Sequence, residues 1–353
     1  MAKRFFIQWD STNHCNLKCA HCYHNREGKE HATHSQGQNL MTFEEVKNMI
    51  DDLEHTSKRW GMIPRIQISG GEPMLRQDLM KILDYTKKLS METRILSNGT
   101  LITPEKAKEL YKRGIRRLQI SIDGNRQTHN KIRRKNYAYD KAMEGISNCS
   151  KAGIRVTISM TLMQSNKGEI EEVIVNSIKA GAGLVGFSSY VPDSKLGLRD
   201  LEFIGAEETY NLFKKITELR KKYAGKIEVL EDEVLWHLIH EDTKLKQGAR
   251  RTGKFLGGCA AGFLGVSVLS DGTIYPCRRL PIPIGNIKEI KLVDLMVNNE
   301  VLKNLRDFDK FKEKGCCEDV NYCKGCRAIA YAVTGDYMAK DPMCFKQYVK
   351  SEE

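Results

Sequence analysis

The chain has no apolar run long enough to cross a bilayer, although 41% of its 353 residues are hydrophobic. Its first residues, MAKRFFIQWD, contain neither a long apolar segment nor a small-residue cleavage site, so they do not resemble a signal peptide. We therefore expect a soluble, cytoplasmic protein without a membrane partner. The length allows a large core and favours one large α/β domain with a smaller one.

Acidic residues are outnumbered by basic ones, and the net charge is +12. No segment interleaves basic and aromatic residues as nucleic-acid-binding motifs do, so we expect no nucleic-acid partner. Basic residues spread along predicted helices are typical of solvated helix faces. A basic protein also suits an acidic partner, either a peptide or a small molecule that carries carboxylates.

The eleven cysteines are an odd number in a chain without a secretion signal, which does not favour a disulfide framework. Three lie within residues 15–22 and seven within 259–344, and such clusters indicate metal ligands. Cys149 stands alone on the apolar side of a predicted helix, so we expect it to be a small buried hydrophobe.

Short strand-like runs alternate with amphipathic helical runs over the first half of the chain. The predicted strands cover residues 4–9, 65–69, 93–97, 116–122, 154–162 and 184–190. Thr42 with Glu45, and Thr103 before Pro104, are typical helix starts. Six β-then-α units predict parallel strands with crossover helices, two units fewer than a closed barrel has.

We therefore predict an α/β protein with a partial (β/α)6 TIM-like barrel over residues 1–205. A helical connector follows at 206–255. Residues 256–353 are rich in Gly, Pro and Cys and have little regular apolar pattern, which predicts a small domain stapled by metal. Trp236 and His237 are expected to pack within the connector. His31 and His34 lie in a polar stretch that predicts a mobile loop over the strand ends.

The loop after the first strand reads HCNLKCAHCYHN. Its Cys15, Cys19 and Cys22 could occupy three corners of a cubane iron–sulfur cluster and leave the fourth iron open, since each iron takes one external ligand. The alternative is a closed zinc site completed by a histidine, for which His14, His21 and His24 are the candidates. A redox dithiol needs only two cysteines and leaves the third without a role.

The next strands also end in residues suited to binding. They are followed by SGGEP (69–73), SNG (97–99) and SIDG (121–124). Ligands of parallel α/β folds bind at the carboxyl ends of the strands. Paired glycines let a ligand approach the backbone closely, and a glutamate can meet an amine. The sequence therefore predicts one site shared by four successive strand ends.

CNLKCAHCY together with GGEP resembles the radical S-adenosylmethionine superfamily over about residues 4–190. The resemblance implies that Cys15, Cys19 and Cys22 hold a [4Fe–4S] cluster whose open iron binds S-adenosylmethionine. One electron, from a flavodoxin or ferredoxin, then cleaves the cofactor to methionine and a 5′-deoxyadenosyl radical that abstracts a substrate hydrogen. The cofactor-binding residues it implies are Tyr23 beside the adenine, Gly70, Gly71 and Glu72 at the methionine amine, and Ser97, Asn98, Ser121, Asp123 and Arg133 around the ribose and carboxylate. Arg133 comes from HNKIRRK (129–135), in which Arg134 stands where the family has glycine.

The C-terminal cysteines resemble the SPASM extension, which carries auxiliary [4Fe–4S] clusters and implies one or two of them here. By this resemblance Cys259, Cys277 and Cys326 serve one cluster, and Cys317, Cys323 and Cys344 serve the other, with Cys316 either a further ligand or spare. The first set has three cysteines, so another group completes it or its open iron binds substrate. A zinc-ribbon tail is the alternative. Arg278, followed by Arg279, stands where sulfatase-maturing members have an aspartate base, so we do not predict that reaction. Guanidinium groups bind carboxylates well.

Three functions follow. The preferred one is modification of a peptide or protein side chain, by a thioether, a carbon–carbon crosslink or a related change. Because the first strand starts near residue 4, a separate leader-peptide-binding protein is then expected. The second is decarboxylation of tetrapyrrole propionates, since residues 323–344 resemble the tail of haem-pathway members. The third is a non-catalytic iron–sulfur electron carrier, against which the residues at the strand ends argue. No catalytic side chain is identifiable beyond the cofactor ligands.

Overall fold

All six predicted strands form and lie side by side in chain order. They are β1 (Arg4–Asp10), β2 (Ile63–Ser69), β3 (Glu92–Ser97), β4 (Arg117–Ser121), β5 (Arg155–Leu162) and β6 (Leu184–Ser189), and each neighbouring pair is parallel. The structure is a computed structural model and describes residues 3–25, 40–195, 197, 200, 202–231, 233–239, 258–321 and 323–349. The loop predicted at His31 and His34 lies outside these residues.

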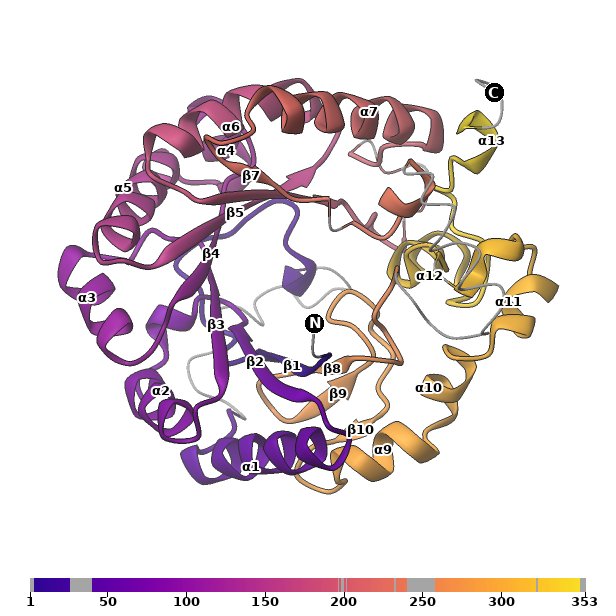
Figure 1. Ribbon diagram of the computed structural model, residues 1–353, viewed down its shortest axis with the longest axis horizontal. Coiled ribbons are helices and arrows are strands. Elements are labelled where there is room, and N and C mark those ends of the chain that lie inside the picture. Colours follow the sequence, from indigo (N-terminus) through magenta and orange to yellow (C-terminus); the bar gives the residue numbers. More distant parts are fainter. Residues whose placement is uncertain are drawn as a thin grey trace.

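The helices between the strands form an outer layer around the curved sheet (Figure 1). They are α1 (Phe43–Arg59), α2 (Leu79–Lys88), α3 (Pro104–Lys112), α4 (Arg126–Arg133), α5 (Ala138–Lys151) and α6 (Ile170–Lys179). Both predicted helix starts are present: Thr42 and Glu45 form a capping box, and Thr103 Oγ1 accepts a bond from Lys106 N. The partial barrel predicted from the sequence is thus confirmed.

The sheet extends beyond the six units on both sides. After α7 (Ala206–Lys222), β7 (Glu228–Val229) pairs in parallel with β6. On the other side β8 (Gly265–Val268) pairs in parallel with β1, and β9 (Thr273–Tyr275) and β10 (Gly285–Asn286) follow in antiparallel order. The segment predicted as a helical connector therefore contains a strand as well as a helix. The domain boundaries at 205 and 255 remain predictions.

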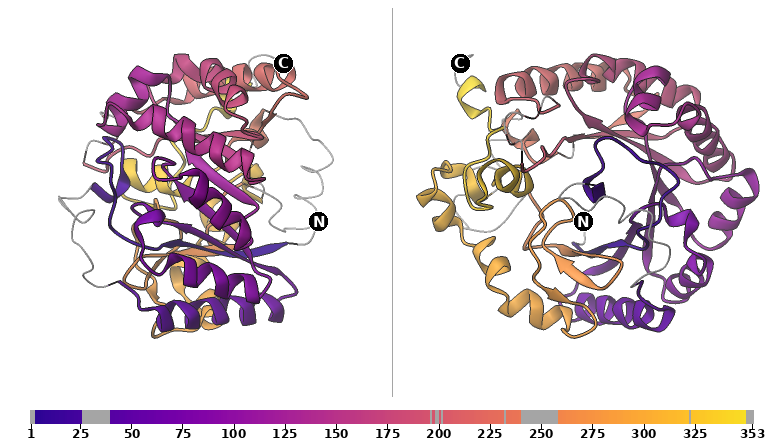
Figure 2. Two further views of the ribbon diagram at one scale, coloured as in Figure 1. Left: turned by 90° about the vertical axis from the view of Figure 1, so that its left-hand side faces the viewer. Right: turned by 180° about the vertical axis from the view of Figure 1, so that it is seen from behind.

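The C-terminal segment, residues 258–349, contains β8 to β10 and then a series of short helices, the first three of which continue the outer layer (Figures 1 and 2). They are α9 (Leu292–Asn298), α10 (Glu300–Asn304), α11 (Phe308–Glu313), α12 (Arg327–Thr334) and α13 (Lys346–Val349). At the start of α9, Leu292 N donates to Asp52 Oδ2 of α1 (2.8 Å), which joins the last part of the chain to the first helix. No helix of the described residues is long and apolar enough to span a membrane.

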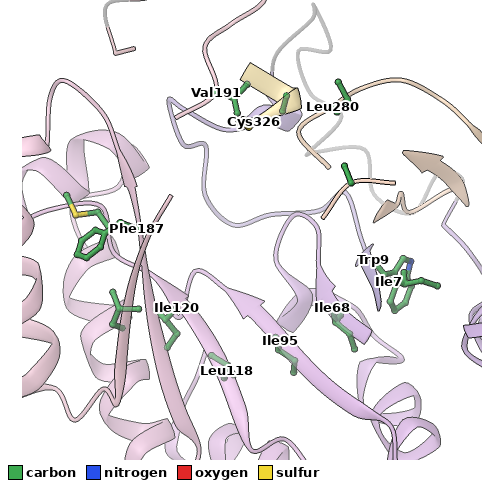
Figure 3. Packing of buried hydrophobic residues seen from close by; sticks show 14 of the residues in the cluster. Ile7, Trp9, Ile68, Ile95, Leu118, Ile120, Phe187, Val191, Leu280 and Cys326 are labelled. Atoms are coloured by element: carbon green, nitrogen blue, oxygen red, sulfur yellow. The ribbon is translucent and has the colours of Figure 1, made fainter. Parts of the chain in front are cut away.

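One hydrophobic core runs from the barrel into the C-terminal segment. On β1 the alternate residues Phe5, Ile7 and Trp9 are buried, and Figure 3 shows the same packing on the following strands. The cluster that contains them also contains Phe311 and Phe345. Cys149 is buried in it, as predicted.

Trp236, on the 3₁₀ turn η5 (Trp236–Leu238), stacks on Phe213 of α7 with ring centroids 4.0 Å apart. His237 Nε2 accepts a bond from Gly258 N (3.1 Å). Trp236 therefore packs within the connector as expected, whereas His237 is half-buried and bonds to Gly258, beyond the predicted connector.

Candidate active site

The carboxyl ends of the strands open into a cavity of about 380 Å³. Each of the six barrel strands contributes a polar residue to its wall: Asp10, Ser69, Ser97, Ser121, Thr161 and Ser189. The strand ends therefore meet at one site, as predicted. Strands β5 and β6 also contribute to this site, although the sequence indicated no binding residue on them.

The three cysteines of the first motif all line this cavity. Leu17 N donates to Cys15 Sγ (3.4 Å), and Arg133 Nη1 donates to Cys19 Sγ (3.5 Å). Burial raises the pKa of the Cys15 thiol to about 12. A bound iron reverses this preference, because coordination deprotonates a thiol. Three thiols on one loop, two with a nearby donor, fit the chemistry of a cubane cluster.

The SGGEP loop lies directly against the start of the cysteine loop. Gly71 N donates to Thr12 O (2.7 Å), and a Cβ on Gly71 would sit 2.1 Å from His14 O. Gly70 has a φ of +123° and a Cβ there would sit 2.5 Å from Thr12 O. Both glycines line the cavity, and their lack of side chains is what lets the two loops touch.

Glu72 does not line the cavity. Its buried carboxylate accepts bonds from Ser97 Oγ (2.8 Å), Asn98 N (2.8 Å) and Met74 N (3.2 Å). Burial raises the pKa of this carboxyl group, and the hydrogen bonds oppose the change. Glu72 thus joins the ends of β2 and β3 beneath the site, and its contact with a methionine amine remains a prediction. Ser97, Asn98 and Ser121 do line the cavity.

Asp123 and Arg133 form a buried ion pair, with Arg133 Nη2 2.5 Å from Asp123 Oδ2. Burial raises the pKa of Asp123, but the charge of Arg133 outweighs it and holds the pKa below its usual range. Arg133 lines the cavity, whereas Asp123 lies behind it. Arg134, which stands at the family's glycine position, adopts the left-handed conformation (φ 56°, ψ 35°). The turn is therefore kept without glycine, and Arg133 still reaches Cys19.

Tyr23 is surrounded by polar residues, of which Asp10 was not identified from the sequence. Asp10 Oδ1 accepts a bond from Ser69 Oγ (2.8 Å), and Tyr23 Oη lies 3.4 Å from both Asp10 carboxylate oxygens. His24 Nε2 lies 3.4 Å from Asp10 Oδ2. The guanidinium of Arg278 lies 5.7 Å from the Tyr23 ring centroid. Asp10 could have been found as the acid that ends the first strand, but nothing local connects residue 278 to residue 23.

Two sets of cysteines lie apart in the C-terminal segment. We call Cys259, Cys277 and Cys326 the first set, and Cys316, Cys317, Cys323 and Cys344 the second set. Burial lowers the pKa of Arg279, but the thiols of the first set and Glu233 outweigh it and raise the pKa. Burial raises the pKa of Cys323, and Cys344 and Cys317 raise it further. Members of each set are thus close enough to act on the charge of a shared neighbour. Among the described residues no three of them are placed to bind a single metal ion, and the role of each cysteine as a ligand of a cluster remains a prediction.

Family models match two parts of the chain: the radical SAM superfamily at residues 9–175, and SPASM, an iron–sulfur cluster-binding domain, at residues 259–327. An AdoMet-dependent heme synthase of Methanosarcina barkeri is 31% identical over 96% of this chain and 95% of its own length. The Fe-coproporphyrin III synthase of the same organism is 28% identical, over 97% and 88%. The sporulation killing factor maturation protein SkfB of Bacillus subtilis is 26% identical, over 80% and 62%.

Two solved structures have the same fold. SuiB of Streptococcus suis bound to S-adenosylmethionine superimposes with a TM-score of 0.73 at 16% identity, over 99% of this chain and 77% of its own. Native anSMEcpe with bound AdoMet superimposes with a TM-score of 0.75 at 17% identity, over 98% and 96%.

These matches decide between the readings of the cysteine motifs. They support iron–sulfur clusters and S-adenosylmethionine as the cofactors in place of zinc, and an enzyme in place of a non-catalytic carrier. The chain belongs to the radical SAM superfamily and carries a C-terminal SPASM domain.

Proposed function

We propose that this enzyme oxidatively decarboxylates propionate side chains of a tetrapyrrole, the second of the functions considered from the sequence. The observation that carries the proposal is an arginine, Arg278, in the wall of the cavity beside Tyr23. Likeness over nearly the whole chain to proteins named heme synthase and Fe-coproporphyrin III synthase supports it.

Arg278 is held so that part of its guanidinium remains available to a ligand. With the Gln8 amide turned to satisfy its polar atoms, Gln8 Oε1 accepts bonds from Arg278 Nε (3.2 Å) and Nη1 (2.7 Å). A guanidinium has five N–H donors, so those on Nη2 remain for another acceptor. A substrate carboxylate is the partner that such a fork binds best.

The chemistry requires a radical and an electron acceptor. Bound S-adenosylmethionine supplies a 5′-deoxyadenosyl radical, which takes one hydrogen atom from the propionate carbon next to the ring. Loss of the carboxylate as CO2 together with one electron then leaves a vinyl group, so atoms and charge balance. We assign the acceptor role to the auxiliary clusters, and the delivery of the initiating electron to a flavodoxin or ferredoxin.

Arg278 would also bind the substrate more tightly than the product. It pairs with the propionate while that group is an anion. The vinyl product carries no charge at this position, so the ion pair that held the substrate is lost when CO2 leaves. The product therefore binds less tightly than the substrate, and its release requires no further conformational change at this position.

Peptide modification is the second candidate, and the likeness to SkfB favours it. That likeness covers less of both chains than the likeness to the heme synthases. This reading requires a peptide substrate and a separate protein that binds its leader.

The test uses the anaerobically reconstituted enzyme with S-adenosylmethionine and dithionite. With iron coproporphyrin III added, we expect 5′-deoxyadenosine, CO2 and a porphyrin that has lost one CO2 and two hydrogens per propionate acid group. Formation of 5′-deoxyadenosine with an unchanged porphyrin would contradict the proposal, and a peptide that loses two hydrogens would then support the second candidate. No 5′-deoxyadenosine from a fully loaded enzyme would contradict both.

A further inference from the structure

Arg327 is a charged side chain enclosed by the C-terminal segment. It begins α12 and is 1% exposed. Its Nη1 donates to Tyr337 O (3.0 Å) and Ala339 O (2.7 Å), and its guanidinium carbon lies 5.0 Å from the Phe311 ring centroid. Two carbonyls therefore hold one edge of the guanidinium and an aromatic ring covers its face, so its plane is fixed.

The other edge has no partner. Among the residues that the structure describes, Arg327 Nε and Nη2 are buried without a hydrogen bond. A buried donor without an acceptor costs about 1–3 kcal/mol, and more when the group is charged. Proteins compensate such a cation with an anion that accepts its donors.

A neighbouring carboxylate, that of Asp341, already accepts two other hydrogen bonds. Asp341 Oδ2 accepts a bond from Cys326 N (2.6 Å), and Asp341 Oδ1 accepts one from Met343 N (2.9 Å). Burial raises the pKa of Asp341, and Arg327 opposes this change without reversing it. Asp341 thus organises the backbone around α12, and no hydrogen bond joins it to the open edge of Arg327 among the described residues.

The open edge lies at the turn that joins the two sets of cysteines. Gly325 stands between Cys323 of the second set and Cys326 of the first, and a Cβ on Gly325 would sit 3.0 Å from Arg327 Nη2 and 2.8 Å from Asp341 Oδ2. The two sets differ in the arginine whose charge acts on them. Burial raises the pKa of Cys316, in the second set, and the charge of Arg327 opposes it. Burial also raises the pKa of Cys326, in the first set, and there the opposing charge is that of Arg279.

We propose that Arg327 donates hydrogen bonds from Nε and Nη2 to an auxiliary [4Fe–4S] cluster held by the second set, and thereby raises its reduction potential. Reduction adds a negative charge to the cluster, and a fixed cation with donors aimed at its sulfurs stabilises the reduced form more than the oxidised one. The inference requires the second set to bind a cluster. It does not depend on the substrate.

The experiment compares wild type with Arg327→Lys and Arg327→Gln in redox titrations followed by EPR. All three carry Cys15, Cys19 and Cys22 as alanine, so that only auxiliary clusters give a signal. Lys303→Gln, which removes an exposed charge from α10, is the matched control. At fixed potential we expect the reduced-to-oxidised ratio of one auxiliary cluster to fall about tenfold in Arg327→Gln, which is about 59 mV for one electron. The ratio should fall less in Arg327→Lys, and it should not change in Lys303→Gln.

A second measurement separates hydrogen bonding from a merely structural role. In protein made with guanidino-¹⁵N arginine, the reduced second cluster should show a nitrogen coupling that Arg327→Lys loses and Arg279→Lys retains. Unchanged midpoints in loaded variants, or equal shifts of both auxiliary clusters, would overturn the proposal. Because the wild-type spectrum needs no variant at position 327, absence of the coupling there would overturn it even if the variants failed to load iron.

Discussion

The barrel and the C-terminal segment hold their candidate ligands in different ways. In the barrel, each strand end contributes at least one polar residue to the cavity, and the parallel sheet fixes their spacing. In the C-terminal segment the cysteines lie outside the strands, in loops around β8 and β9 and between the short helices, and charged side chains such as Lys324, Arg327 and Asp341 are buried there. A site built on a sheet can exist before its cofactor arrives, whereas a site built from turns and buried charges needs the cofactor to hold it together.

The largest expected effect separates the two regions by chemistry. Cys19→Ala removes one of the three predicted ligands of the barrel cluster and should abolish cleavage of S-adenosylmethionine. Because the C-terminal sets share no cysteine with the barrel loop, the absorbance of the auxiliary clusters should remain. The measurement is 5′-deoxyadenosine by chromatography beside iron and sulfide analysis. Loss of all iron together would show that the two regions are not independent.

Removal of iron should destabilise the C-terminal segment more than the barrel. After anaerobic chelation we expect backbone amides of α11 and α12 to exchange hydrogen rapidly, because their buried charges lose the clusters that compensate them. Amides of β2 to β5 should stay protected, since their hydrogen bonds involve no ligand. Hydrogen exchange read by mass spectrometry checks this. Uniform loss of protection along the whole chain would instead mean that the shared core unfolds as one unit.

A smaller effect is expected at Arg278. Arg278→Gln should raise the KM for a tetrapyrrole substrate about tenfold, which corresponds to about 1.4 kcal/mol, with little change in kcat. The KM of Arg278→Lys should lie between those of wild type and Arg278→Gln, because an ammonium group keeps the positive charge but cannot form the two parallel hydrogen bonds of a guanidinium. Arg126→Gln, at an exposed ion pair with Asp140 outside the cavity, is the control. An equal rise in KM for the control would contradict a specific contact of Arg278 with the substrate, because both variants would then act through the loss of one positive charge.

The smallest effect tests the scaffold alone. Thr103→Ala removes the hydroxyl that accepts from Lys106 N at the start of α3 and should cost about 1 kcal/mol of stability. Activity at moderate temperature should not change, since α3 contributes nothing to the cavity. Thermal unfolding and turnover, measured on the same preparation, check both halves of this prediction. A lower turnover would show that the barrel end is less independent of its helices than the sheet suggests.

The strands of the barrel and the cysteine loop could be predicted from short stretches of the sequence. Alternating apolar residues such as Phe5, Ile7 and Trp9 identify a strand, and the cysteine spacing identifies the loop after it. What local patterns could not supply are contacts between distant residues. Arg278 meets Gln8 and Tyr23 only because β8 pairs with β1, and Glu72 turns from the cavity because a buried carboxylate bonds to the donors of Ser97 and Asn98.

The pairing of β8 with β1 has a consequence for folding during synthesis. On this side β1 receives its partner only after Gly265, the first residue of β8, has been synthesised. Until then one side of β1 presents unpaired N–H and C=O groups beside Phe6 and Trp9, which is the kind of edge that other chains can join. Synthesis that stops before Gly265 should therefore leave an aggregation-prone product, and the complete chain depends on protection of this edge while it grows.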